Sequence, residues 1–209
     1  MRANRDPLSF LRRGMKLPRE VEIKLKVPDP RSLKKGLNEC GFEVVGRRHF
    51  ESNTVFDSRD SRLRRSSSLL RLRTEGNRHI LTFKGPPHAS STYKIRTEFE
   101  TEIGDADAIQ QIFEALGLRP IFRYEKFRTV YAEKNREKAK AASLLVYDET
   151  PIGNFVELEG PPRWIDRTAR RLGYLKRDYI TGSYAALYLD YCKENRVKRG
   201  NMVFSTDKC

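Results

Sequence analysis

Cysteine and long apolar runs are both scarce in this chain of 209 residues. The three cysteines, Cys40, Cys192 and Cys209, are odd in number and widely spaced, which argues against a disulfide framework and favours a reducing compartment. No apolar run approaches the roughly 20 residues needed to span a membrane. Residues 1–18 also lack the continuous apolar core of a signal peptide. We therefore expect a cytoplasmic protein with no membrane partner.

The motifs of several large enzyme classes are missing as well. The sequence holds no GxxxxGK[ST] loop, no GxSxG turn and no HExxH helix, which argues against a P-loop, a serine-nucleophile elbow and a zincin site. The histidines have no zinc-ligand spacing, so we expect them on the surface or in loops. They are His49, His79 and His88.

Charge is abundant and unevenly spread. The formal net charge is +14, from 42 basic and 28 acidic residues, and a strongly basic chain suggests nucleic acid as a partner. Four segments that we interpret as tails or loops carry all of this excess, which leaves a neutral body with basic appendages. Such appendages are usually solvated, so nucleic-acid binding is not expected as the main function. The segments are residues 1–19, 59–65, 134–140 and 193–209.

Side-chain periodicity and turn residues predict many strands and few helices. The predicted strands cover residues 19–27, 43–57, 68–75, 78–85, 92–103, 120–132, 143–149 and 154–160. The predicted helices cover residues 30–40, 105–116, 162–172 and 181–193. Many strands with short connections predict an α+β, mainly β fold: an eight-stranded antiparallel closed β-barrel with a few helices packed outside. A barrel of this size is filled by side chains or holds one small ligand.

Two of the predicted strands place acids and bases on one face. In residues 20–25 the side chains of Glu20, Glu22 and Lys24 share one side, and aliphatic side chains share the other. The same alternation recurs over residues 93–103. Because both signs of charge recur at the same register, we interpret this face as a charged interior. The second strand contributes Lys94, Arg96, Glu98, Glu100 and Glu102.

A phosphate-rich ligand with a divalent metal would satisfy both signs of charge. Burying many ions costs several kcal/mol for each ion unless it is paired or meets a ligand, as an order of magnitude. Carboxylates supply hard oxygen ligands for Mg²⁺ or Mn²⁺, while arginine and lysine bind phosphate oxygens. The acids on these faces are Glu20, Glu22, Glu98, Glu100, Asp148, Glu157 and Glu159, and the bases are Lys24, Arg71, Arg73, Lys84, Arg96, Lys126 and Arg128.

The run Glu20-Val21-Glu22-Ile23-Lys24 resembles the ExExK signature of the CYTH superfamily. This group, the triphosphate tunnel metalloenzymes, includes class IV adenylyl cyclases, thiamine triphosphatases and inorganic triphosphatases. Six further blocks follow in the family's order, and together they cover about residues 19–191. They are Leu70-Arg71-Leu72-Arg73, Leu81-Thr82-Phe83-Lys84-Gly85-Pro86, Arg96-Thr97-Glu98-Phe99-Glu100, Lys126-Phe127-Arg128, Tyr147-Asp148 and Gly153-Asn154-Phe155-Val156-Glu157-Leu158-Glu159.

The resemblance implies an eight-stranded β-tunnel and a site inside it. The bases listed above, Lys24 included, are expected to bind the triphosphate. One or two Mg²⁺ or Mn²⁺ ions are expected on Glu20, Glu22, Glu157 and Glu159, together with Asp148 and Glu100. Lys24 is also the candidate general base, although neighbouring acids normally raise a lysine's pKa and so oppose that role.

Two reactions fit such a site, and a third hypothesis is that the protein binds its ligand without catalysis. In a hydrolase, water attacks the terminal phosphorus of inorganic triphosphate, thiamine triphosphate or ATP. In a class IV adenylyl cyclase, the ribose hydroxyl of ATP attacks the α-phosphorus and pyrophosphate leaves. We lean towards hydrolysis, because no base-recognition pocket is evident. The alternative is a non-catalytic polyphosphate or RNA binder that uses the basic tails.

The resemblance also suggests how the chain is divided. We expect a basic N-terminal extension over residues 1–18, a single CYTH tunnel domain over residues 19–192, and a basic C-terminal tail over residues 193–209. A homodimer is left open.

Several smaller features have simpler interpretations. Asp105 and Asp107 mark a helix start rather than a DxD metal motif. The arginines of residues 62–65 are expected in a mobile hairpin tip, and a site role for Tyr184 is left open. Untidy alternation over residues 122–126 predicts a bulge.

Overall fold

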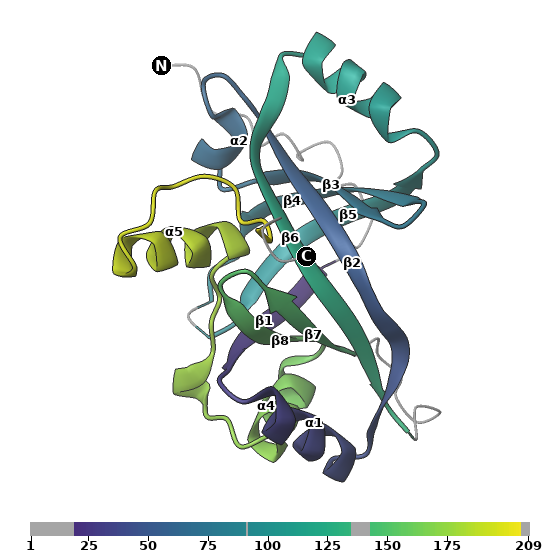
Figure 1. The fold of residues 1–209 in the computed structure, drawn as a ribbon, viewed down its shortest axis with the longest axis vertical. Coiled ribbons are helices and arrows are strands. Elements are labelled where there is room, and N and C mark those ends of the chain that lie inside the picture. Colours follow the sequence, from purple (N-terminus) through teal and green to yellow (C-terminus); the bar gives the residue numbers. More distant parts are fainter. Residues whose placement is uncertain (1–18, 91, 135–142, 206–209) are drawn as a thin grey trace.

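The computed structural model describes residues 19–90, 92–134 and 143–205, which form a closed barrel of antiparallel strands with helices around it (Figure 1). The order around the barrel is β1-β5-β4-β3-β2-β6-β7-β8. The strands are β1 (Arg19–Val27), β2 (Phe42–Ser58), β3 (Leu69–Glu75), β4 (Arg78–Pro87), β5 (Lys94–Ile103), β6 (Leu118–Glu133), β7 (Leu144–Thr150) and β8 (Gly153–Glu159). The helices are α1 (Pro30–Glu39), α2 (Arg62–Arg65), α3 (Ala106–Ala115), α4 (Pro162–Arg171), α5 (Tyr184–Glu194) and the short 3₁₀ helix η3 (Lys176–Asp178).

The barrel closes through β1, which pairs with β5 on one side and β8 on the other. Glu22 lies opposite Lys94 of β5 and also opposite Glu159 of β8, so the ExExK strand joins the two halves of the charged face. The predicted eight-stranded antiparallel barrel is therefore confirmed. The predicted helices are also present and lie outside it, as Figure 1 shows.

The apolar side of the strands faces outwards, against helices. Ile23 and Leu25 of β1 are fully buried in a cluster that includes Leu37 of α1 and Ile165 of α4. A second cluster joins Phe113 of α3 to the outer faces of β2 and β3. The hydrophobic effect thus favours the arrangement in which aliphatic positions meet the helices, and the alternate positions point inwards.

The connection between β2 and β3 differs from the expected mobile tip. Residues 62–65 form the helical turn α2, because the carboxylate of Asp57 accepts hydrogen bonds from the backbone N–H groups of Leu63 and Arg64, each at 2.9 Å. Asp57 is itself buried, and these bonds lower its pKa although burial opposes that shift. The same carboxylate accepts a third bond from the N–H of Ser58 at 2.8 Å.

The C-terminal segment packs along the barrel beyond the predicted tunnel domain. Met202 is buried, its N–H donates to the carbonyl of Arg123, and its carbonyl accepts from the N–H of Glu125, both at 2.9 Å. The N–H of Phe204 donates to the Glu125 carboxylate at 3.1 Å. Part of the segment expected as a tail therefore extends the fold. The domain boundary at residue 192 stays a prediction.

Irregularities in the long β2 and β6 pair set which side chains face inwards. A register shift between Val55 and Phe56 lies opposite Phe122 and Pro120, next to the stretch where the sequence predicts a bulge. Beyond it, Tyr124 and Lys126 both line the barrel interior.

No helix among the described residues is long and apolar enough to cross a membrane.

Gly46 lies between two further register shifts in the pairing of β2 with β6. Because it has no side chain, β6 can pack closely against β2 at this point. A Cβ at this position would lie 2.9 Å from the Cβ of Val130. We predict that Gly46→Ala lowers the free energy of unfolding by about 1–3 kcal/mol, the usual penalty for overpacking. Urea denaturation measures this loss of unfolding free energy. Gly104→Ala is the control, since nothing lies within 4 Å of the added Cβ, and an equal loss in both variants would contradict this account.

Candidate active site in the barrel interior

The barrel encloses a cavity of about 370 Å³ lined mainly by charged side chains. All seven bases predicted from the sequence line it: Lys24, Arg71, Arg73, Lys84, Arg96, Lys126 and Arg128. Six of the seven acids predicted on the inner faces do so too: Glu20, Glu22, Glu98, Glu100, Glu157 and Glu159. The fold therefore gathers into one cavity residues that lie far apart along the chain.

The seventh predicted acid, Asp148, does not line the cavity and is the centre of a buried ion-pair network. Its carboxylate accepts two hydrogen bonds from Arg128, each at 2.7 Å, and one from Lys126 at 2.9 Å. The hydroxyl of Tyr184 donates a further bond at 2.8 Å. Asp148 has no exposed side-chain surface. Four donors on one buried carboxylate make it a counter-ion that orients two bases.

The acids on β1 and β8 are held by lysines. Glu20 accepts from Lys84 at 2.6 Å, and Lys24 lies between Glu157 at 3.0 Å and Glu22 at 3.3 Å. Glu22 also accepts from Lys94. Because Glu22 and Glu157 sit next to these lysines, their pKa values are lowered although burial opposes the shift.

Burial is the main cause that disfavours the charged forms of Glu20 and Glu159. Burial and the nearby Glu22 raise the pKa of Glu20 to about 8, although Lys84 acts in the opposite direction. Burial, with Glu22 and Glu98, likewise raises the pKa of Glu159 to about 7, although Lys84 again opposes the shift. A carboxylate whose charge is disfavoured in this way gains from a nearby cation. This part of the cavity therefore suits a divalent metal with oxygen ligands.

Three arginines that line the cavity carry unsatisfied donors. The Nε groups of Arg71, Arg73 and Arg96 are buried and make no hydrogen bond to any described residue. Arg73 lies 3.6 Å or more from its nearest carboxylates. Burial lowers the pKa of Arg96, and burial together with Lys24 lowers that of Lys94. An anion with several oxygen atoms would satisfy these donors and relieve the shifts.

The geometry opposes Lys24 as a general base. Burial alone would lower the pKa of its ammonium, but Glu157 and Glu22 outweigh burial and raise it. A lysine in this state keeps its proton at neutral pH and cannot accept another. The expected general-base role therefore does not fit, whereas an electrostatic role does.

Tyr184, whose role the sequence left open, is in the cavity wall. Its ring centroid lies 5.3 Å from the ammonium groups of both Lys24 and Lys126, which is within the range of cation–π attraction. Burial and the charge of Asp148 raise the pKa of its hydroxyl, so it remains a donor. The N-terminus of α5 brings the ring there, with Ser183 as its capping residue.

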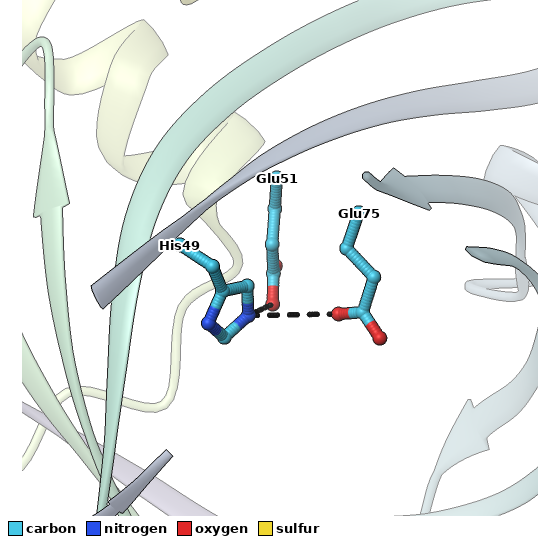
Figure 2. A group of neighbouring side chains, drawn as sticks. All are labelled: His49, Glu51 and Glu75. Atoms are coloured by element: carbon cyan, nitrogen blue, oxygen red, sulfur yellow. Dashed lines mark ion pairs between the residues drawn. The ribbon is translucent and has the colours of Figure 1, made fainter. Parts of the chain in front are cut away.

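Sequence reasoning missed a group on β2 and β3. The side chains of His49, Glu51 and Glu75 converge, as Figure 2 shows, and their ligand atoms lie within 4.8 Å of one another. The Nε2 atom of His49 lies 3.4 Å from Glu51 and 3.6 Å from Glu75. The signal was present, since Glu51 and Asn53 alternate along β2 as the charged residues of β1 do.

Among the described residues, the four predicted metal ligands Glu20, Glu22, Glu157 and Glu159 do not form a comparably tight group. The carboxylates of Glu20, Glu22 and Glu157 are instead held in ion pairs with lysine or arginine. The oxygen chemistry of the four acids and the raised pKa values of Glu20 and Glu159 nevertheless fit a hard divalent ion. Binding would require at least some of these carboxylates to leave their lysine partners.

A model of the CYTH domain matches residues 18–184, and the chain belongs to this family. A protein of Methanocaldococcus jannaschii named "putative adenylate cyclase" is 31% identical over 140 residues, which make up 67% of this chain and 75% of that protein. The two are therefore related over most of their length.

Two solved structures share the fold. A Vibrio parahaemolyticus protein with the same kind of name has a TM-score of 0.69 at 20% identity, covering 83% of this chain and 99% of that one. A structure of a Hippeastrum protein has a TM-score of 0.59 at 19% identity, covering 82% and 95%. At these identities the likeness extends to the fold alone.

Asp148 provides a test of the buried network. We predict that Asp148→Asn lowers the free energy of unfolding by about 3–5 kcal/mol, because it leaves Arg128 and Lys126 without their principal counter-charge. Chemical denaturation measures the loss. Asp190→Asn on the exposed side of α5 is the control and should change stability by less than about 0.5 kcal/mol. Equal stability of the two variants would contradict the network's importance.

Proposed function

We propose that this protein is a metal-dependent enzyme that binds a triphosphate inside the barrel and cleaves a phosphoanhydride bond. The observation that carries the proposal is the set of buried Nε donors on Arg71, Arg73 and Arg96 that no described residue satisfies. Buried polar groups are nearly always hydrogen-bonded in folded proteins, and all three arginines line the same cavity, so their unpaired donors support an acceptor that binds there. A triphosphate supplies many anionic oxygens within a short span.

The same proposal assigns roles to the residues of the cavity. The triphosphate-binding groups are Lys24, Arg71, Arg73, Lys84, Arg96, Lys126 and Arg128, with Lys94 added by the structure. Glu20, Glu22, Glu157 and Glu159 would hold Mg²⁺ or Mn²⁺, with Glu100 at the more exposed end. Asp148 takes the role of counter-ion to Lys126 and Arg128 and not that of a metal ligand, because its oxygens are already occupied.

Catalysis in this arrangement is mainly positioning and electrostatic stabilisation. Phosphoryl transfer passes through a loose transition state whose charge spreads over the phosphate oxygens, and fixed arginine and lysine donors stabilise that charge. A bound divalent ion supplies further neutralisation of phosphate oxygens. Asp148 and Tyr184 keep Lys126 and Arg128 in place, so these donors need little rearrangement when the charge develops.

Hydrolysis is the first candidate reaction, and nucleotide cyclisation the second. The name of the Methanocaldococcus relative favours adenylate cyclase activity, with ATP as substrate and cyclic AMP and pyrophosphate as products. The Hippeastrum structure is described as revealing a dominant triphosphatase activity. Inorganic triphosphate, thiamine triphosphate and ATP all carry the group that the cavity bases would bind.

The products distinguish these reactions directly. Purified protein is incubated with inorganic triphosphate, ATP or thiamine triphosphate and either Mg²⁺ or Mn²⁺. Orthophosphate release supports the hydrolase, and cyclic AMP with pyrophosphate supports the cyclase. Turnover that survives deletion of residues 1–18 places the activity in the barrel. No turnover, combined with loss of all ligand affinity on that deletion and strong salt dependence, would instead indicate a tail-driven polyanion binder.

The paired change of Glu20 and Glu22 to Gln tests the metal assignment. We predict at least about a hundredfold loss of metal-dependent turnover with the barrel retained, since two hard ligands become neutral amides. Steady-state kinetics at several Mn²⁺ concentrations measure the loss, and circular dichroism checks the fold. Glu102→Gln, on an exposed ion pair with Arg78, serves as the control. Unchanged turnover in the double variant would refute the assignment.

Arg73→Ala tests the triphosphate assignment. Because Arg73 has no close carboxylate partner, we predict that its loss weakens binding of inorganic triphosphate at least about tenfold and affects orthophosphate less. Isothermal titration calorimetry with each ligand measures the difference. Arg48→Ala is the control because Arg48 pairs with Glu149 and lies over the ring of Phe127. Equal weakening for both phosphates would make Arg73 a structural partner of the acids.

A further inference from the structure

Glu51 is a buried carboxylate at the centre of the bases proposed to bind triphosphate. It lies on β2 directly opposite Lys126 of β6, and its side chain is only 1% exposed. Lys126 approaches it to 3.4 Å, Arg128 to 3.7 Å and Arg73 to 3.9 Å. An acid surrounded by three bases in this way is either a structural anchor for them or a competitor for their charge.

The contacts of Glu51 are too loose for an anchor. Its Oε2 atom is buried and makes no hydrogen bond to any described residue. Asp148 binds the same Lys126 and Arg128 at 2.7–2.9 Å with good hydrogen bonds. Since Asp148 already orients these two bases, Glu51 mainly offsets part of their positive charge, which is then less available to a bound anion.

The negative charge of Glu51 acts on any anion that enters the cavity. A phosphate oxygen that binds Lys126, Arg128 or Arg73 comes within a few ångströms of the Glu51 carboxylate, and two like charges at such a distance repel strongly in a protein interior. A bare triphosphate, which carries the most charge, is repelled most. A triphosphate that already carries a divalent ion has a smaller net charge and is repelled less.

We propose that Glu51 is a specificity-determining residue that makes the cavity discriminate against the bare triphosphate and in favour of its metal complex. The inference rests on the proposed function. It differs from the metal-ligand assignment, because Glu51 acts here by repulsion and contacts no metal. The group of His49, Glu51 and Glu75 does not make a better cation site, since Arg73, Arg128 and Lys126 surround Glu51 and oppose any added positive charge.

The test is the affinity of the full-length protein for inorganic tripolyphosphate, measured by calorimetry once in EDTA and once in excess Mg²⁺. In Glu51→Gln, the affinity for the bare ligand should increase at least about tenfold. This increase corresponds to only part of the Coulomb energy of two adjacent like charges in a protein interior. Binding of the magnesium complex should tighten less, so the ratio of the two affinities shrinks. A merely structural lesion would weaken binding of both forms.

Glu149→Gln is the matched control, because it removes the same charge from the outer face, where Glu149 pairs with Arg48. It should leave both affinities within about twofold of the wild type. Should Glu51→Gln fail to fold, Glu51→Asp keeps the charge but withdraws it by one methylene, and an intermediate tightening is expected. The rise in unfolding temperature with tripolyphosphate in EDTA gives a second measure for either variant.

Three outcomes would overturn the inference. The first is a wild-type protein that binds tripolyphosphate while Glu51→Gln binds the bare form equally or less well. The second is a loss of affinity for Mn²⁺ alone in Glu51→Gln, which would make Glu51 a cation ligand. The third is a wild-type protein that binds no tripolyphosphate with or without Mg²⁺. Only this third outcome would also contradict the proposed function, so it is distinguishable from the other two.

Discussion

The structure depends on burying many charges of both signs inside a closed barrel. Removing a single ion from water costs several kcal/mol, as an order of magnitude, unless another charge or hydrogen bond replaces the lost solvation. The barrel meets this constraint by alternation, since each strand turns its aliphatic side to the helices and its charged side inwards. Closure of the sheet then brings together acids and bases that no single strand could pair.

The ion pairs and hydrogen bonds within the protein do not satisfy every charged group of the interior. Burial and neighbouring carboxylates raise the pKa values of Glu20 and Glu159. The Nε donors of Arg71, Arg73 and Arg96 remain unsatisfied. The first feature favours a bound cation, and the second favours an anion with many oxygens. A triphosphate that carries a divalent ion meets both demands within one cavity, which is why we favour this ligand class for this CYTH protein.

Much of this was predictable from the sequence, because period-two alternation is a strong signal when it recurs on several strands. It identified the eight strands and, with the ordered CYTH blocks, seven bases and six acids that line the cavity. Glu51 was missed although it alternates with Asn53 along β2, because its closest charges come from other strands, such as Lys126 on the neighbouring strand β6. The raised pKa of Lys24 likewise depends on Glu157, which comes from the far end of the chain. The helical turn α2 was missed because its stabilising carboxylate, Asp57, precedes it on a strand.

The central claim is that a metal-loaded triphosphate completes the charge balance of the interior. Thermal unfolding of the full-length protein with inorganic tripolyphosphate and Mg²⁺, compared with orthophosphate and Mg²⁺ at equal ionic strength, tests it most directly. A ligand that binds only the folded state stabilises it by RT ln(1 + [L]/Kd), so the unfolding temperature rises with ligand concentration and affinity. The account predicts a concentration-dependent rise with tripolyphosphate that clearly exceeds the rise with orthophosphate. An unfolding temperature that responds equally to both, or to neither, would contradict it.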